Sequence, residues 1–324
     1  MDTPEKFRRA MQDVCDQGWA LAALTAAVES GLAAGMVEPR GAAELASRAG
    51  TSEDVATALV DVLVALGMAS RDGDRYQACA GMAPFLAGHR KNILVSDLRS
   101  ALLQSGFLVA QAKRGDITTG WQYTDPEIIQ AQGLLSEGAL EPMAQALFPQ
   151  LDGLLERLDQ PGAAVLDVGA GAAGLSIAFA RRFPQARVVG LEPAPVPLSV
   201  GQRNVAASDV GHRIELRAIR VEELGDEGAF DFAWLPQMFL PTPVLERALA
   251  AVRRALKPGG WLLTAAVSIP GDTVQAAAAR LRNTLWGGGR REAAELRALV
   301  EAAGFAEVRT GQSPGPFPPI VARR

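Results

Sequence analysis

The stretch VLDVGAGAAG, residues 165–174, decides the fold of this chain. Its first residues predict a short strand, its glycines predict a tight turn, and the sequence LSIAFARRF, residues 175–183, predicts a helix. Glycine lets the backbone turn sharply and lets a ligand approach without meeting a Cβ atom. The amino-terminal end of the helix offers free N–H groups and the positive end of a dipole. The stretch therefore predicts a ligand-binding loop at the carboxyl end of a strand.

An acidic residue at the end of the next predicted strand follows this loop. The sequence ARVVGLE, residues 186–192, predicts the next strand and ends at Glu192. An acid about 20 residues after the loop is placed to accept hydrogen bonds from both hydroxyls of a ribose. A glycine loop with a later acid also describes a nicotinamide cofactor site. Asp167 argues against that alternative, because a nicotinamide site keeps a hydrophobic residue there and a buried carboxylate is costly without a partner.

Five further strand-like segments follow, up to residue 324. They are RIELRAI (213–219), FDFAWL (230–235), GGWLLTAAV (259–267), AEVRT (306–310) and PPIVARR (318–324). Helical segments separate several of them, and this alternation predicts a doubly wound, largely parallel sheet. The sequence GQSPGPFP, residues 311–318, joins the last two segments without a helix, which predicts an antiparallel pair at that edge.

The amino-terminal part is predicted to be mostly helical. Apolar residues recur at helical spacing over residues 12–36, from Val14 and Trp19 to Leu32. Thr51 or Ser52 is placed to cap a later helix.

A hairpin is predicted next, because Asp72-Gly73 is a turn dipeptide between two potential strands. Three helices and a hairpin resemble a winged-helix domain, a class that often binds DNA. The expected recognition helix carries Glu53, Asp54 and Asp61 and no Lys or Arg, so phosphate would be repelled. We therefore expect no nucleic-acid partner, and a domain that packs against a second copy of itself.

Residues 91–160 are predicted to form a helical linker and substrate cover. The loop RGDITTGWQYTDPE, residues 114–127, interrupts it, and Asp125 and Pro126 are placed to start a helix there. The chain is thus expected to contain a winged-helix-like domain (1–90), this cover (91–160) and a Rossmann-like domain (161–324).

The composition is that of a soluble enzyme. The 324 residues are 48% hydrophobic and 21% charged, which suits a globular protein of two domains. A net charge of −4 gives no general attraction for nucleic acid or an anionic membrane. The two cysteines are too few for a disulfide framework or a zinc site. We expect a cytoplasmic protein with no metal and no membrane partner.

The ordered motifs of residues 161–324 resemble those of class I S-adenosylmethionine-dependent methyltransferases. VLDVGAGAAG is similar to their motif I, LEPAP (191–195) to their second acidic motif, and FDFAWLPQMFLP (230–241) to their fourth strand and its loop. ALKPGGWLL (255–263), EAAGFAEVRT (301–310) and IVARR (320–324) are similar to the fifth, sixth and seventh strand regions. The resemblance implies a seven-stranded Rossmann-like α/β domain that binds S-adenosyl-L-methionine.

The amino-terminal half is similar, by pattern alone, to the dimerisation domain of bacterial and plant small-molecule O-methyltransferases. This likeness implies a homodimer, a small-molecule substrate and a role in secondary metabolism.

The resemblance also assigns cofactor contacts. Asp167 would hold the ammonium group of the methionine, and Glu192 the ribose hydroxyls. Gly169, Gly171 and Gly174 would lie along the methionine and ribose. The remaining expected contacts are Pro193, Arg220, Val221, Leu235 and Pro236.

Arg220 departs from the family pattern. After the third strand these enzymes commonly carry an aspartate that accepts a hydrogen bond from the adenine amino group, and arginine has donors only. Three readings stay open. Arg220 stacks on the adenine, Glu222 accepts in its place, or the cofactor binds weakly or not at all.

The catalytic base is not evident. Plant-type relatives carry a histidine after the fourth or fifth strand, and neither loop has one here. His89 is a candidate, Asp97, Asp116 and Glu137 are alternatives, and an acidic acceptor or proximity alone would need no base.

The residues predicted to contact the acceptor are mostly aromatic. They are Trp121, Tyr123, Gln237, Met238, Phe239 and Trp286. Aromatic side chains in a polar loop indicate recognition, here of an aromatic or polyketide-like acceptor.

Three functions fit these patterns. The preferred one is methyl transfer from S-adenosylmethionine to an oxygen of such an acceptor. The alternative is a methyltransferase-fold enzyme that catalyses cyclisation or decarboxylation, with the cofactor structural or absent, as Arg220 and the missing histidine suggest. The third is a ligand-sensing winged-helix regulator, which the acidic helix opposes.

Overall fold

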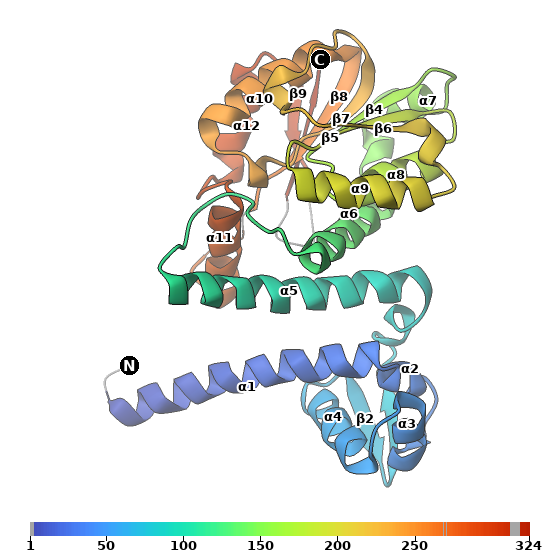
Figure 1. The fold of residues 1–324 in the computed structure, drawn as a ribbon, viewed down its shortest axis with the longest axis vertical. Coiled ribbons are helices and arrows are strands. Elements are labelled where there is room, and N and C mark those ends of the chain that lie inside the picture. The colour runs from blue at the N-terminus through green and yellow to red at the C-terminus, as the bar shows by residue number, and fades with distance from the viewer. Residues whose placement is uncertain (1–2, 268, 270, 312–317) are drawn as a thin grey trace. The chain divides into compact units, whose positions relative to one another are not determined.

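The computed structural model describes residues 3–267, 269, 271–311 and 318–324. The chain divides into two compact units, Met1–Ala110 and Gln111–Arg324. Figure 1 shows a mostly helical first unit and a second unit in which helices surround a sheet. The predicted helix-free connection at 311–318 falls largely on 312–317, outside the described residues.

The first unit combines helices with a small antiparallel sheet of strand order β1-β3-β2. Its elements are α1 (Pro4–Glu29), α2 (Leu32–Gly35), β1 (Arg40–Gly41), α3 (Ala42–Ala49), α4 (Glu53–Ala65), β2 (Ala69–Asp72), β3 (Arg75–Ala78), the 3-10 helix η1 (Ala83–Phe85) and most of α5 (Gly88–Arg114). Of the two predicted caps, Ser52 is the one used, because its Oγ accepts a hydrogen bond from the Val55 amide at 3.3 Å.

The predicted hairpin is present, with its turn one residue later than expected. Asp72 pairs with Arg75, so Gly73 and Asp74 are the central residues of the turn. Gly73 has a φ of +59°, and a type II′ turn places glycine at this first central position.

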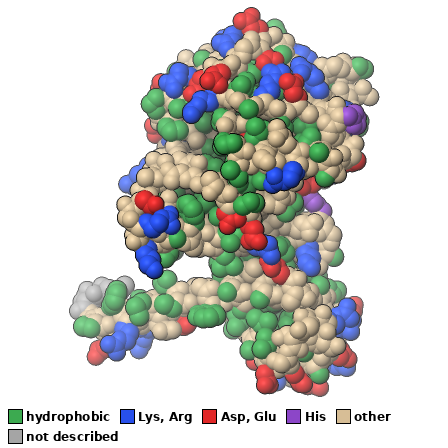
Figure 2. All heavy atoms as spheres, viewed as in Figure 1, with side chains coloured by type: hydrophobic (Ala, Val, Ile, Leu, Met, Phe, Trp, Pro, Cys, Tyr) green, Lys and Arg blue, Asp and Glu red, His purple; other side chains and the backbone are tan. Residues whose placement is uncertain are grey.

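Helix α1 buries only its carboxyl-terminal part. Leu24 and Val28 lie in the core of the first unit, whereas Val14 and Trp19 are 73% and 77% exposed. The predicted helix is present, but it ends at Glu29, and α2 follows as a separate short helix. Phe7 and Met11 are also exposed, and Figure 2 shows hydrophobic side chains along this part of α1.

Among the described residues, α5 is the one helix long and apolar enough to cross a membrane, judged by length and composition alone. Its Arg99 is ion-paired with Glu29 of α1, and Nη2 lies 3.0 Å from Oε2. The hydrogen bond from Arg99 lowers the pKa of Glu29. The polar pair attaches α5 to the first unit.

The second unit contains the predicted seven-stranded sheet. Its strands are β4 (Ala164–Val168), β5 (Arg187–Leu191), β6 (Ile214–Arg217), β7 (Phe230–Trp234), β8 (Leu256–Ala265), β9 (Ala306–Thr310) and β10 (Pro319–Arg323). Their order is β6-β5-β4-β7-β8-β10-β9, and β10 is antiparallel to both β8 and β9. The predicted fold class and the antiparallel edge are confirmed. The order reverses between β4 and β7, where doubly wound sheets bind ligands.

Helices cover both faces of this sheet. They are α6 (Pro126–Ala146), α7 (Leu154–Leu158), α8 (Gly174–Arg182), α9 (Pro195–Ala207), α10 (Thr242–Ala255), α11 (Val274–Trp286) and α12 (Ala293–Ala302), with 3-10 turns η2 (Phe148–Gln150), η3 (Gly211–Arg213), η4 (Val221–Glu223) and η5 (Gln237–Phe239). Leu166 of β4 packs in the cluster with α10 and α12, and its neighbour Val165 packs in the cluster with α6 and α8. Every residue of β4 is therefore buried, as a parallel strand covered on both faces requires.

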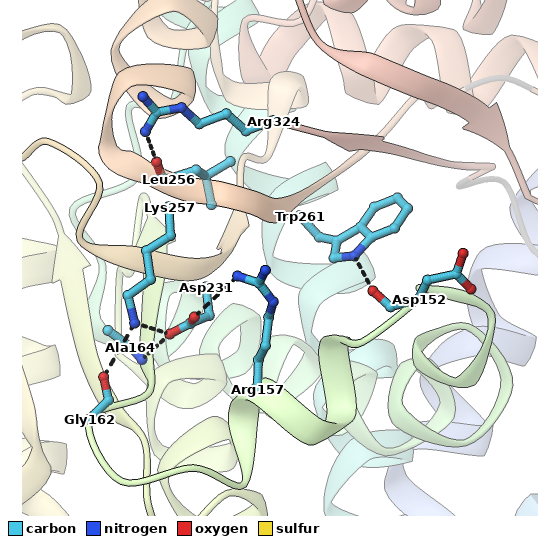
Figure 3. Close-up of polar contacts among 9 residues, drawn as sticks. All are labelled: Asp152, Arg157, Gly162, Ala164, Asp231, Leu256, Lys257, Trp261 and Arg324. Carbon is cyan, nitrogen blue, oxygen red and sulfur yellow. Dashed lines mark hydrogen bonds and ion pairs between the residues drawn. The ribbon is translucent and has the colours of Figure 1, made fainter.

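Asp231 holds the start of the central strands together. Its carboxylate accepts a hydrogen bond from the Ala164 amide at 2.9 Å and one from Nζ of Lys257 at 2.7 Å, and Nη1 of Arg157 lies 3.9 Å away. Figure 3 shows these groups of β4, β8 and α7 converging on the β7 side chain. The buried acid is thus paired with cations, and its role is structural.

Two glycines let α6 and α8 touch backbone to backbone. A Cβ atom on Gly174 would lie 1.9 Å from the carbonyl oxygen of Gly133, and one on Gly133 would lie 2.5 Å from Cβ of Ala172. Gly174 is therefore glycine because α6 passes over the start of α8. This close packing of α6 positions the glycine loop between β4 and α8.

We predict that Gly133→Ala lowers the free energy of unfolding by about 1–3 kcal/mol, because the added methyl group overpacks the α6–α8 contact. Urea unfolding measures the change. Gly106→Ala is the matched control, since Gly106 is also a helical glycine but has nothing within 4 Å. It should be neutral or stabilising by up to about 1 kcal/mol. Equal effects of the two substitutions would contradict the packing argument.

Candidate active site

The loop after β4 has the left-handed backbone that its glycines predict. Gly169 and Gly171 have φ angles of +70° and +53°. A Cβ atom on Gly169 would find Pro236 at 3.6 Å, and one on Gly171 would meet its nearest atom only at 3.9 Å. The loop after β4 therefore leaves open space beside Gly171. Pro236, in the loop after β7, lies next to Gly169 in the same loop.

Asp167 lies at the end of β4 with a single side-chain partner. It is 2% exposed, and Oγ of Ser176 donates a hydrogen bond to its Oδ2 at 2.6 Å. Burial raises the pKa of Asp167 to about 7, and the charge of nearby Glu192 adds to the shift. A hydroxyl is a weak compensation for a buried carboxylate, so a ligand cation would be favoured here.

Glu192 follows β5 and faces the glycine loop. Its Oε2 accepts a hydrogen bond from the Gly171 amide at 3.0 Å, and its Oε1 accepts one from the Ala194 amide at 2.8 Å. Burial raises the pKa of Glu192. Each oxygen of a carboxylate has a second lone pair, so the side chain retains acceptor capacity for hydroxyl donors.

The residues after β6 and β7 complete this edge. Val221 and Leu235 are buried, whereas Pro193 and Arg220 are exposed. The Arg220 amide donates to Oε2 of Glu223 at 3.0 Å. Glu222, the alternative adenine acceptor, is mostly buried and lies 3.5 Å from Nη2 of Arg247.

Four of the predicted acceptor-binding residues form one aromatic cluster. The ring of Trp121 lies 4.7 Å from that of Tyr123 and 5.1 Å from that of Phe239, and the rings of Phe239 and Trp286 are 5.8 Å apart. Trp286 also hydrogen-bonds to Tyr123, whose pKa is raised by burial. The Gly120 amide donates to the Leu285 carbonyl at 2.9 Å and joins two of the three contributing segments.

A buried polar group that sequence reasoning missed lies beside this cluster. Arg291 is 4% exposed and hydrogen-bonds to Oε1 of Gln237 and, at 2.8 Å, to Oγ1 of Thr242. Burial lowers the pKa of Arg291. Arg290 precedes it directly, and nothing in the sequence distinguishes the two arginines. Met238, between Gln237 and the aromatic ring of Phe239, is buried as well.

The candidate bases are dispersed. His89 and Asp97 belong to the first unit, and His89 is exposed at the start of α5. Oδ2 of Asp116 pairs with Arg114 at 3.0 Å, and Oε1 of Glu137 with Arg181 at 3.3 Å. Within the part of the chain that the structure describes, no three His, Cys, Asp or Glu residues are grouped to hold a metal ion.

Comparison with known proteins agrees with this geometry. Residues 165–260 match the family model described as a methyltransferase domain. The ubiquinone biosynthesis O-methyltransferase of Hahella chejuensis is 33% identical over 135 residues, which cover 41% of this chain and 55% of that relative. The chain thus spans about half the length of this curated relative. The predicted resemblance to methyltransferases is confirmed.

Solved structures share the fold over nearly the whole chain. A candidate O-methyltransferase from Nostoc punctiforme is 23% identical with a TM-score of 0.71 and covers 100% of both chains. PigF, solved with SAH, is 20% identical with a TM-score of 0.67, over 99% of this chain and 100% of that one. The mitomycin 7-O-methyltransferase MmcR is 23% identical with a TM-score of 0.63, over 99% and 98%. At these identities the likeness establishes the fold.

We predict that Asp167→Asn stabilises the ligand-free chain at neutral pH. Because the folded-state pKa of about 7 lies above the unfolded value, the folded chain holds one extra proton between about pH 4 and 7, and stability falls as the pH rises through that window. Asparagine is not subject to this loss. Its advantage in the free energy of unfolding should grow from pH 5 to 8 and reach about 1–3 kcal/mol.

Urea unfolding at several pH values measures this difference. The control is Asp159→Asn at an exposed carboxylate, which should leave the pH profile as in the parent chain. An Asp167→Asn advantage that stays constant with pH would contradict the raised pKa.

Proposed function

We propose that this chain transfers the methyl group of S-adenosyl-L-methionine to an oxygen of a small-molecule acceptor, an aromatic or polyketide-like secondary metabolite. The observation that carries the proposal is the arrangement of Asp167, the open face of Gly171 and the side chain of Glu192 at one edge of the sheet. The methyltransferase-domain match and the shared fold with PigF and MmcR support it.

The chemical groups at this edge fit the parts of the proposed cofactor. The buried carboxylate of Asp167 suits the ammonium group of its methionine, and the free lone pairs of Glu192 suit the two ribose hydroxyls. Either Arg220 stacks on the adenine or Glu222 accepts from its amino group. The bound cofactor supplies an electrophilic methyl group on a sulfonium.

The chain's own residues position the acceptor. The cluster of Trp121, Tyr123, Phe239 and Trp286 offers aromatic faces to a planar molecule and excludes water around it. Methyl transfer is an in-line displacement, so holding the two reactants in line supplies much of the rate enhancement. Asp116 and Glu137 are each paired with an arginine, and we propose that no side-chain base is needed.

A cyclising or decarboxylating enzyme of the same fold is the second candidate. The exposed Arg220, in the place of an adenine-binding acid, favours it. Methyl transfer to a natural acceptor would exclude this candidate.

We predict micromolar binding of S-adenosylmethionine and S-adenosylhomocysteine by calorimetric titration. Gly171→Arg should abolish both, because its side chain would fill the space in front of the loop. Gly81→Arg is the control at an exposed glycine with nothing within 4 Å, and it should bind as the parent does. A folded chain that binds neither molecule would favour the second candidate.

We further propose a cytoplasmic homodimer, with residues 1–90 as a winged-helix-like dimerisation domain and residues 91–160 as the linker and substrate cover. The exposed apolar residues of α1 support the dimer, because a contiguous apolar surface indicates a protein contact.

Light scattering is predicted to give twice the mass of one chain. The double substitution Val14→Glu and Trp19→Glu should halve that mass, because it places charges on the proposed contact. Val274→Glu, at a residue 87% exposed in α11, should leave it unchanged. A monomeric parent chain would refute the homodimer.

A further inference from the structure

Arg291 is a buried cation without a counter-ion. No carboxylate of the described residues lies within ion-pair distance of it, and Glu295 acts on it only through its charge. Its two Nη atoms bind the neutral oxygens of Gln237 and Thr242, and its Nε has no hydrogen-bond partner. A buried charge that only neutral groups compensate is unfavourable, and an anion from outside would relieve it.

Gln237 extends this array of donors. Arginine can only donate, so the side-chain oxygen of Gln237 must face Arg291, and its Nε2 is turned to the other side. That Nε2 is fully buried and has no hydrogen-bond partner in the described structure. The chain therefore holds two unused buried donors, Nε of Arg291 and Nε2 of Gln237, within one hydrogen-bonded pair.

The donor pair and the aromatic cluster share their supporting elements. Gln237 and Phe239 both belong to η5, and Phe239 contacts the rings of Trp121 and Trp286. Trp286 ends α11, and Gly287 to Gly289 lead from it to Arg291. The donor pair and two rings of the aromatic cluster are thus carried by the same two elements, η5 and the segment that runs from the end of α11 to Arg291.

We propose that Arg291 and Gln237 form an oxyanion subsite and that the acceptor enters as a delocalised oxyanion, a carboxylate or a vinylogous carboxylate such as the enolate of a 1,3-dicarbonyl. The inference rests on the proposed function and names its substrate class. One oxygen of the anion accepts from the donor pair, and the other attacks the methyl carbon.

The chemistry balances without a base. A lone pair of the attacking oxygen forms the O–CH₃ bond, and the electrons of the breaking S–CH₃ bond pass to sulfur. The negative charge of the acceptor and the positive charge of the sulfonium cancel, and no proton has to be removed. An ionised acceptor therefore accounts for the absence of a histidine in the loops after β7 and β8.

Matched pairs of probes test the subsite. Calorimetry at pH 7 on the chain saturated with S-adenosylhomocysteine compares 2-naphthoate with 2-naphthamide, and 2-hydroxy-1,4-naphthoquinone with its methyl ether. We expect the anion of at least one pair to bind about tenfold or more tightly than its neutral partner. A larger affinity ratio for the naphthoate pair would indicate a carboxylate acceptor, and a larger ratio for the naphthoquinone pair would indicate a vinylogous carboxylate.

Substitutions connect that ratio to the donor pair. Arg291→Met should bring the ratio of anion affinity to neutral-probe affinity close to one. Arg297→Met, at an exposed arginine of α12, should preserve this ratio. Gln237→Glu supplies an internal carboxylate to Arg291 and should also remove the preference for the anion while the neutral probe still binds. A purely structural role of Arg291 would change the melting temperature and leave the ratio intact.

Two results would overturn the inference. One is equal or absent binding of both members of each pair by the chain loaded with S-adenosylhomocysteine. The other is an anion preference that persists in Arg291→Met and in Gln237→Glu. Failure to bind S-adenosylhomocysteine in a separate titration would instead remove the proposed function.

Discussion

The backbone of the loop between β4 and α8 touches three neighbouring elements, and each supplies a glycine at the contact. A Cβ atom would lie 2.5 Å from Cβ of Ala172 if placed on Gly133 of α6, and 2.8 Å from Cβ of Ala170 if placed on Gly190 of β5. On Gly201 of α9 it would lie 2.5 Å from the Gly171 carbonyl oxygen. This confinement holds the Gly171 amide 3.0 Å from Glu192, and the candidate site depends on it.

Buried acids at the two ends of the sheet differ in their partners, and their roles follow from that difference. Asp231, at the start of β7, is neutralised by Lys257 and Arg157 and ties strands together. Asp167, at the end of β4, has the hydroxyl and the backbone amide of Ser176, and Glu192 near it has the backbone amides of Gly171 and Ala194. At the carboxyl ends of the strands, where a doubly wound sheet binds its ligand, the two acids thus have no cationic side chain as a partner.

Local patterns in the sequence were sufficient for the strands, for a helix cap at Thr51 or Ser52, and for the left-handed turn of the glycine loop. Trp121 and Tyr123 stood out in the sequence as aromatic residues of a polar loop, but the contacts of Trp121 with Phe239 and of Phe239 with Trp286 appear only in the fold. Arg291 was not predictable, since its burial depends on Gln237, 54 positions away. The importance of Gly133 likewise appears only where α6 crosses α8.

The four aromatic rings come from the loop before α6, from η5 and from the end of α11, and belong to neither of the two hydrophobic clusters that fill the faces of the sheet. A substitution of one of these four rings therefore leaves the two clusters on the faces of the sheet intact. Variation over generations can therefore change these aromatic side chains without changing the residues that cover the two faces of the sheet. A chain of this design is well suited to evolutionary divergence, in which the scaffold persists while the molecules it accepts change from one descendant to another.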